Sequence, residues 1–186
     1  MRVIAGSAKG VKLLSVPGKT TRPITDQVKE ALFNIIGVDV EGKLFLDLFG
    51  GTGAVGIEAL SRGAEHAVFL DINYRAVKII EENLRITQLH PYATVLKKDA
   101  FAFLRELPKQ AFDFVYIAPP QYRSIWATTM QTLDENPGWV RLRKTAIIQI
   151  HPKEFVEGIN YTNFAEFDRR IYGDTMLVFY ERILSE

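Results

Sequence analysis

The stretch LFLDLFGGTGAVGIEAL, residues 44–60, constrains the fold more than any other part of this chain. Its first six residues are mostly apolar and predict a buried strand. The four residues Gly50 to Gly53 predict a turn with unusual backbone angles, and residues 54–60 predict the start of a helix. A strand, a glycine turn and a helix bring free backbone N–H groups close to a bound ligand. The stretch therefore predicts a cofactor site.

The chain around this stretch alternates between strand and helix patterns. Apolar runs predict strands at 44–48, 67–70, 94–96, 112–117 and 145–150, and helical periodicity predicts helices at 53–62, 73–87 and 100–107. Such alternation is typical of a parallel sheet with helices on both faces. Residues 163–172 and 175–182 flank Gly173-Asp174 and predict an antiparallel hairpin at the sheet edge. The predicted fold is α/β and Rossmann-like, with a mostly parallel sheet of seven strands.

The first 37 residues predict a separate extension. Short apolar runs broken at Gly6 and Gly10 predict a small β-hairpin over residues 2–16, which is too short to bury a face by itself and must lean on the main domain or a partner. Thr25 or Asp26 caps a helix that ends at Gly37. We expect a substrate-binding extension at 1–37 and a cofactor-binding domain at 38–186.

The extension carries an uneven distribution of charge. Residues 1–25 hold five cations and no acid, namely Arg2, Lys9, Lys12, Lys19 and Arg22. A basic arm of this kind attracts a nucleic-acid backbone, although a solvated surface hairpin would have the same composition. We expect Arg2, Lys9, Lys12 and Arg22 to contact RNA phosphates.

Composition excludes several classes of function. The chain has 186 residues, a net charge of +1 and no apolar run near the roughly 20 residues that a membrane-spanning helix needs. It has no cysteine, and His66, His90 and His151 lack metal-ligand spacing. We expect a monomeric cytoplasmic protein that binds neither a membrane nor a metal.

The flanks of the glycine turn indicate which cofactor binds. Gly51, Gly53 and Gly56 match G-x-G-x-x-G, and Asp71 follows at about the distance expected for an acid that holds a ribose, which fits both NAD and S-adenosylmethionine. Asp47 precedes the turn, where its carboxylate would repel a pyrophosphate but attract an ammonium and a sulfonium. This acid favours S-adenosylmethionine.

A third acid, Asp99, opens the helix after the third strand, where it can accept from an adenine amino group while the Ala100 N–H meets the ring. Each acid alone could be a turn residue or a helix cap. Together they lie at the ends of three successive strands, where doubly wound folds bind ligands. The expected cofactor contacts are Asp47, Phe49, Gly51, Gly53, Asp71, Ile72, Asp99 and Ala100.

The fourth strand runs into Ala118-Pro119-Pro120-Gln121-Tyr122. Two prolines fix the backbone and leave carbonyl oxygens pointing in set directions, which suits the binding of an exocyclic amino group that is to be methylated. Tyr122 could stack on a base taken out of its stack. A rigid loop with an incidental tyrosine is the alternative. We expect Ala118, Pro119, Pro120 and Tyr122 to form the catalytic pocket.

Several segments together resemble a known family. They are RVIAGSAKGVKLLSVPG (2–18), RPITDQVKEALFN (22–34), DLFGGTG (47–53), GIEALSRG (56–63) and the double proline. The chain resembles the bacterial 16S ribosomal RNA (guanine-N2)-methyltransferase D family over nearly its whole length. This resemblance implies a class I methyltransferase fold and S-adenosylmethionine as the cofactor. It also implies methylation of a guanine N2 in 16S rRNA, with the rRNA or the assembling small ribosomal subunit as partner.

The double-proline motif departs from the family pattern. The family has Asp or Asn, two prolines, then Tyr or Phe, whereas this chain has Ala118 and Gln121 at the outer positions. Catalysis would then rely on the carbonyl groups of Ala118 and Pro119 and on Tyr122. Two alternatives stay open: an RNA-binding assembly protein with an altered catalytic site, and a methyltransferase for DNA or small molecules.

Overall fold

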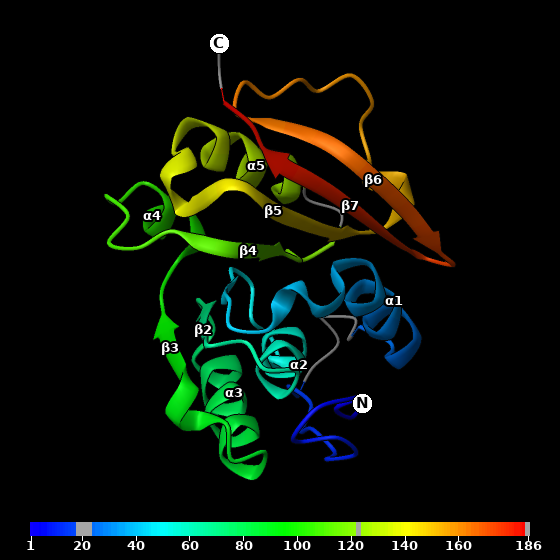
Figure 1. Ribbon diagram of the computed structural model, residues 1–186, viewed down its shortest axis with the longest axis vertical. Helices are drawn as coiled ribbons and strands as arrows, with labels where there is room; N and C mark the ends of the chain where they lie inside the picture. The colour runs from blue at the N-terminus through cyan, green and yellow to red at the C-terminus, as the bar shows by residue number, and fades with distance from the viewer. Residues whose placement is uncertain (18–23, 122–123, 185–186) are drawn as a thin grey trace.

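The protein is built around one seven-stranded sheet, seen in the computed structural model, which describes residues 1–17, 24–121 and 124–184 (Figure 1). The strands are β1 (Leu44–Asp47), β2 (His66–Asp71), β3 (Ala93–Lys97), β4 (Phe112–Ile117), β5 (Val140–Ile150), β6 (Phe164–Tyr172) and β7 (Thr175–Arg182). Their order across the sheet is β3-β2-β1-β4-β5-β7-β6. Strands β1 to β5 are parallel, whereas β7 runs antiparallel to both β5 and β6. The predicted α/β fold with its antiparallel C-terminal hairpin is confirmed.

The strand order reverses between β1 and β4. The chain moves outward from β1 through β2 to β3 and then returns to place β4 on the other side of β1. Ligands of doubly wound sheets bind outside the C-terminal ends of the strands at this reversal. Asp47 and Asp71 are the last residues of β1 and β2, whereas Asp99 and the double-proline loop follow the ends of β3 and β4.

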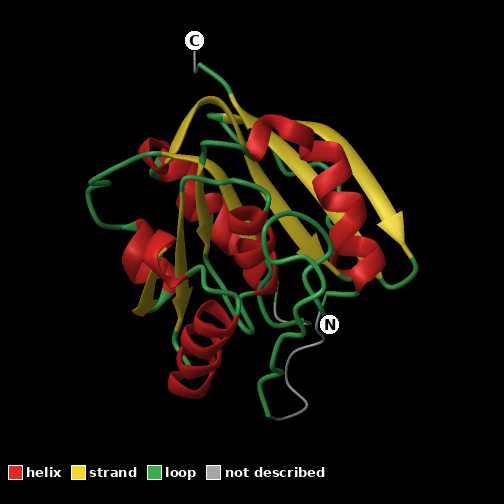
Figure 2. Cartoon of the chain, turned by 60° about the horizontal axis from the view of Figure 1, so that its bottom comes forward, coloured by secondary structure: helices red, strands yellow, loops and turns green. Residues whose placement is uncertain are grey.

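Helices cover both faces of the sheet (Figure 2). The α-helices are α1 (Asp26–Ile36), α2 (Ala54–Ser61), α3 (Tyr74–Ile86), α4 (Ala100–Leu104) and α5 (Ile125–Glu135). The short 3-10 helices are η1 (Gly37–Val40), η2 (His90–Tyr92), η3 (Pro137–Trp139) and η4 (Pro152–Glu154). One buried cluster joins α1, α2 and α3 to one face, and a second joins α4 and α5 to the other. Within the described residues, no helix is long and apolar enough to cross a membrane.

Helix α1 begins and ends as its sequence predicts. Thr25 Oγ1 accepts a hydrogen bond from the Val28 N–H at 3.2 Å, so Thr25 rather than Asp26 is the cap. Gly37 ends the helix with a φ of 59°. Leu32 and Phe33 are fully buried against the sheet, which makes α1 part of the main core.

The N-terminal arm, residues 1–14, is a hairpin reduced to one β-bridge between Arg2 and Lys12. It leans on the main domain, as expected for a hairpin too short to bury a face. Val3, Ala8 and Leu13 enter the same hydrophobic cluster as α1, α2 and α3. Gly6 approaches α2 so closely that a Cβ there would lie 1.7 Å from the Ser61 carbonyl oxygen, which excludes any side chain. The division of the chain at residue 37 stays a prediction.

Two features were not predicted from the sequence. Helix α5 has three threonines and no strong amphipathic pattern, so its stability comes from burying Trp126, Met130 and Leu133 against the sheet. Strand β5 begins at Val140, five residues before its predicted start. The sequence pattern missed its first half because that half is charged and exposed, and because its pairing with β4 is interrupted by an irregularity.

Candidate cofactor and base-binding site

Asp47 lies at the end of β1 beneath the glycine turn. Its side chain is only 1% exposed, and its Oδ1 has no hydrogen-bond partner among the described residues. Burial raises the pKa of Asp47 to about 7, with a smaller contribution from the charge of Asp71, while backbone hydrogen bonds from Phe49 and Gly56 oppose the rise. A buried carboxyl oxygen without a donor suits a cationic ligand group at this position.

The glycine turn is held from two sides. Gly53 has a φ of 77° and precedes the first residue of α2, a conformation that side chains rarely adopt. Asp71, at the end of β2, accepts from the Gly51 N–H at 2.9 Å through Oδ2 and from the Asn73 N–H at 2.8 Å through Oδ1. The predicted ribose acid therefore also fixes the position of the turn.

The third predicted acid lies on the adjacent strand end. Asp71 pairs in register with Lys97, and Asp99 follows two residues later as the cap of α4, where it accepts from the Ala102 N–H at 2.9 Å. Ala100 is buried, whereas Ile72 is 68% exposed although it is apolar. An exposed isoleucine directly after Asp71 suits contact with the flat face of an adenine ring. The sheet therefore brings all the predicted cofactor residues to one edge.

Strand β4 delivers the double-proline loop to the same edge. Asp47 pairs in register with Tyr116, so Ala118 follows two residues past the level of the buried acid. Ala118 and Pro119 are half-buried, and Pro120 is exposed. Tyr122, the predicted stacking residue, lies outside the described residues, and so does Arg22.

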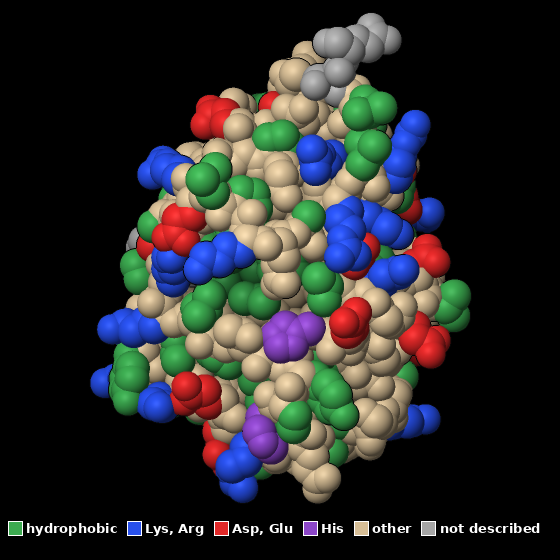
Figure 3. Space-filling model, turned by 60° about the vertical axis from the view of Figure 1, so that its left-hand side comes forward, with side chains coloured by type: hydrophobic (Ala, Val, Ile, Leu, Met, Phe, Trp, Pro, Cys, Tyr) green, Lys and Arg blue, Asp and Glu red, His purple; other side chains and the backbone are tan. Residues whose placement is uncertain are grey.

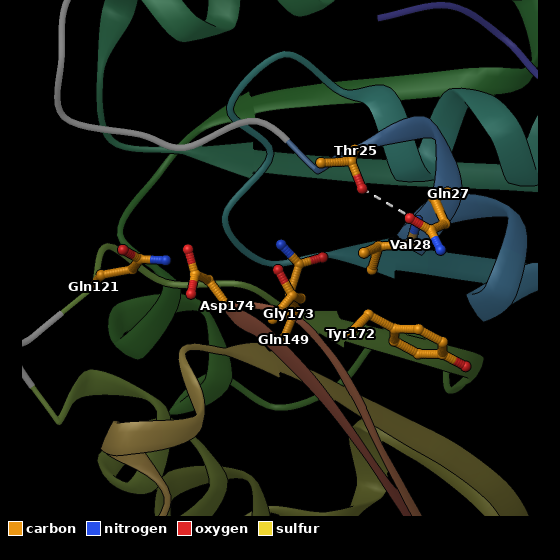
Figure 4. Close-up of a pocket in the computed structure, with 9 residues that line it drawn as sticks. Thr25, Gln27, Val28, Gln121, Gln149, Tyr172, Gly173 and Asp174 are labelled. Carbon is orange, nitrogen blue, oxygen red and sulfur yellow. Dashed lines mark hydrogen bonds between the residues drawn. The ribbon is translucent and has the colours of Figure 1, made fainter.

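A polar cleft of about 220 Å³ opens beside this loop (Figure 4). Gln121, Gln149 from β5 and Asp174 from the β6–β7 turn form one wall region, and Thr25 and Gln27 at the start of α1 form the other. The Gln149 amide points into the cleft, while the Tyr172 ring points away from Gln149 and Asp174 (Figure 4). Sequence reasoning missed Gln149, because no local motif links β5 to the double-proline loop.

Several buried polar residues that sequence reasoning also missed hold the N-terminal arm, among them Glu58 and Asn83. Glu58 on α2 accepts from the Ile4 and Ala5 N–H groups at 2.8 and 3.0 Å, and it pairs with the buried Lys29 at 3.3 Å. Asn83 on α3 accepts from the Leu14 N–H at 2.7 Å and donates to the Leu14 carbonyl oxygen at 3.1 Å.

Asn83 also reaches the glycine turn, because its Nδ2 donates to the Thr52 carbonyl oxygen at 2.8 Å. A signal for Asn83 exists in the sequence: it falls on the inward face of α3, three residues after Ile80. The arm and the turn are therefore bound by one side chain.

The described cations of the arm are on its surface. Lys9 and Lys12 are exposed, and the exposed Arg2 has its Nε 3.3 Å from the Asp26 carboxylate. On another face of the molecule, cations are interspersed with acids instead of forming one patch (Figure 3). Within the described part of the chain, no group of three or more His, Asp or Glu residues is arranged to hold a metal ion.

Comparisons with known proteins find relatives over most of the chain. A family model described as "Conserved hypothetical protein 95" matches residues 1–181. The Bacillus subtilis (strain 168) protein named "Putative rRNA methyltransferase YlbH" is 42% identical over 137 residues, which are 73% of this chain and 74% of that protein. The Escherichia coli (strain K12) protein named "Ribosomal RNA small subunit methyltransferase D" is 33% identical over 140 residues, 75% of this chain and 69% of that protein.

A solved structure shows the same fold. The Escherichia coli protein called "Putative methyltransferase yhhF" superposes with a TM-score of 0.86 and 28% identity, covering 98% of each chain. The similarity thus extends over the arm, the helix α1 and the sheet together. The chain belongs to the family of the ribosomal RNA small subunit methyltransferase D proteins, as its sequence motifs predicted.

Proposed function

We propose that this protein transfers a methyl group from S-adenosylmethionine to the exocyclic N2 amino group of a guanine in 16S rRNA. The observation that carries the proposal is the position of buried Asp47 beneath a glycine turn, with Asp71 and Asp99 on the next two strand ends. Family membership supports ribosomal RNA as the substrate. Such a substrate implies a cytoplasmic enzyme that meets the rRNA or the assembling small subunit.

The residues present fit S-adenosylmethionine. Asp47 would face the ammonium group, the Asp71 carboxylate would hold the ribose hydroxyls, and Asp99 with Ile72 would bind the adenine. The cofactor supplies an activated methyl group on a sulfonium, so no covalent intermediate with the protein is needed. Gly51, Gly53, Phe49 and Ala100 complete the proposed contacts.

The protein's part in the chemistry is positioning. The carbonyl oxygens of Ala118 and Pro119 would accept from the amino group of the base, so that the nitrogen lone pair faces the methyl group. Pro120 fixes the loop, and Tyr122 is proposed to stack on the base. The N–C bond would form as the methyl–sulfur bond of the cofactor breaks, with S-adenosylhomocysteine as the leaving group. The amino group would lose one proton, and water beside the exposed loop is the proposed acceptor.

Methylation of undermethylated 30S subunits tests this proposal. The purified protein with tritiated S-adenosylmethionine should label 16S rRNA, and mass spectrometry of the digested RNA should identify N2-methylguanosine. An Asp47→Asn variant is the control for dependence on the cofactor site. Label on another base or on another nitrogen would contradict the guanine-N2 assignment.

Ala118 favours one alternative, an RNA-binding assembly protein that kept the fold without the reaction, because the side-chain acceptor of the family is missing. This alternative predicts that the protein binds S-adenosylhomocysteine and 30S subunits but transfers no methyl group to any RNA. The methylation assay with a parallel binding measurement separates the two functions.

A further inference from the structure

The polar cleft has the size and chemistry of a site for a single base. Its volume of about 220 Å³ is smaller than the roughly 300–1,000 Å³ of pockets that enclose larger ligands. Its walls carry hydroxyl, amide and carboxylate groups, which can both donate to and accept from the edges of a planar ring. Because Gln121 belongs both to the cleft and to the double-proline loop, a base in the cleft would lie beside that loop.

Strand register places Gln149 next to Ala118. Ile117 of β4 pairs with Ile148 of β5 in a parallel ladder, so Ala118 and Gln149 follow at the same level on neighbouring strands. Tyr116 and Ile147 belong to the hydrophobic cluster beneath α1, α2 and α3, and Ala118 packs against that cluster. Side chains two residues apart on a strand share a face, so Gln149 lies on the same face as Ala118.

The Gln149 amide is fixed by a buried phenol. Tyr116 is 3% exposed, and its hydroxyl donates to Gln149 Oε1. Burial raises the pKa of Tyr116 well above its ordinary value, and the nearby Asp47 charge adds to the rise, so the hydroxyl stays a donor. Because Oε1 accepts from Tyr116, the Nε2 group can donate into the cleft.

We propose that Gln149 binds the target guanine and supplies a side-chain amide donor beside Ala118, which has no polar side chain; this inference rests on the proposed function. Gln149 Nε2 donates to a ring acceptor of the base. The Ala118 and Pro119 carbonyl oxygens accept from the amino group. On the same wall of the cleft, the Asp174 carboxylate, whose Oδ1 lies 3.9 Å from His151 Nε2, suits the N1–H of guanine. Adenine has no N1–H donor, so this wall favours guanine.

Steady-state kinetics on undermethylated 30S subunits at saturating S-adenosylmethionine tests this inference. The variants are Gln149→Leu, which removes the amide, and Gln149→Glu, which keeps an acceptor for Tyr116 but loses the donor. We expect both variants to lower kcat by at least tenfold with little change in KM, because the arm still docks the subunit. Gln110→Leu is the matched control, because Gln110 is exposed in the loop before β4, at the far end of that strand. It should retain wild-type rates.

A rescue separates base binding from a structural role. Ala118→Asn places a side-chain amide beside the missing one, so kcat of the double variant Gln149→Leu with Ala118→Asn should be at least fivefold higher than kcat of Gln149→Leu alone. Affinity for S-adenosylhomocysteine should be the same in all variants. If Gln149→Leu does not fold stably, the kcat of Gln149→Glu tests the inference in its place.

The outcomes distinguish this inference from the proposed function. If the wild type is active and both Gln149 variants have rates within twofold of it, the inference about Gln149 is overturned, whereas the proposed function stands. Absence of wild-type turnover would overturn the proposed function and the inference with it. Loss in the variants without rescue by Ala118→Asn would show that Gln149 does not replace the side chain at position 118.

Discussion

At the scale of single residues, Asp47 is a carboxylate that is almost completely removed from water. It is buried, one of its oxygens has no partner among the described residues, and burial raises its pKa to about 7. A raised pKa in the folded state means that the protonated carboxyl is favoured there. The contribution of Asp47 to the free energy of unfolding is fully present below its ordinary pKa of 3.8. This contribution is lost as the pH rises through about 7.

This titration predicts a pH-dependent affinity for the cofactor product. The ammonium group of S-adenosylhomocysteine prefers ionised Asp47, so binding measured by calorimetry should strengthen by about tenfold from pH 6 to pH 8. Asp47→Asn should bind more weakly and with little pH dependence. The ligand-free variant should also lose less stability than the wild type over this range. An equal pH dependence in wild type and variant would contradict this role for Asp47.

Asn83 is a single residue whose side chain connects two segments of the protein. Its side chain bonds the arm at Leu14 and the glycine turn at Thr52, and it is fully buried. Replacing it with alanine removes its three hydrogen bonds to the backbone of Leu14 and Thr52, each worth about 0.5–1.5 kcal/mol. We expect Asn83→Ala to lower the free energy of unfolding by about 3 kcal/mol in urea titrations. Asn34→Ala, on the exposed face of α1, should change it by less than about 0.5 kcal/mol. Equal stability of the two variants would contradict the bridging role.

At the scale of elements, the arm is the proposed contact with RNA. Its phosphate contacts predict that Lys9→Glu with Lys12→Glu weakens binding to 30S subunits and flattens the salt dependence by about one unit per lost contact. The matched control reverses the charges of Arg105 and Lys109, which are also exposed but lie just after α4, away from the arm in the sequence. If both double variants lose the same affinity, net charge and not the arm governs docking.

At the scale of the whole molecule, the reversal of strand order locates the site. Hydrogen exchange with S-adenosylhomocysteine should show new protection at residues 47–53, 71–73 and 99–100, where β1, β2 and β3 end. Strand β6, at the far edge of the sheet, should exchange at the same rate with and without ligand. Protection centred on the cleft between α1 and β5 would show that the cofactor binds in the cleft, which would contradict its assignment to the ends of β1, β2 and β3.

Much of this architecture could be predicted from the sequence, because apolar periodicity reflects burial directly. Strands 112–117 and 175–182 were predicted with their observed bounds, and the acids fell at strand ends as expected. The rest depends on contacts between distant segments. Gln149 acquires its position from strand pairing, and Glu58 is buried only because the arm supplies two N–H groups and α1 supplies Lys29. No local pattern encodes such partners.

The bridge made by Asn83 has a consequence for motion. When residues 1–14 move away from the core, Asn83 loses both of its hydrogen bonds to Leu14 and keeps its bond to Thr52. Its side chain is then less restrained, so we expect opening of the arm to loosen the glycine turn. RNA that holds the arm in place would keep Asn83 fixed on Thr52, which would couple substrate docking to the residence time of the cofactor.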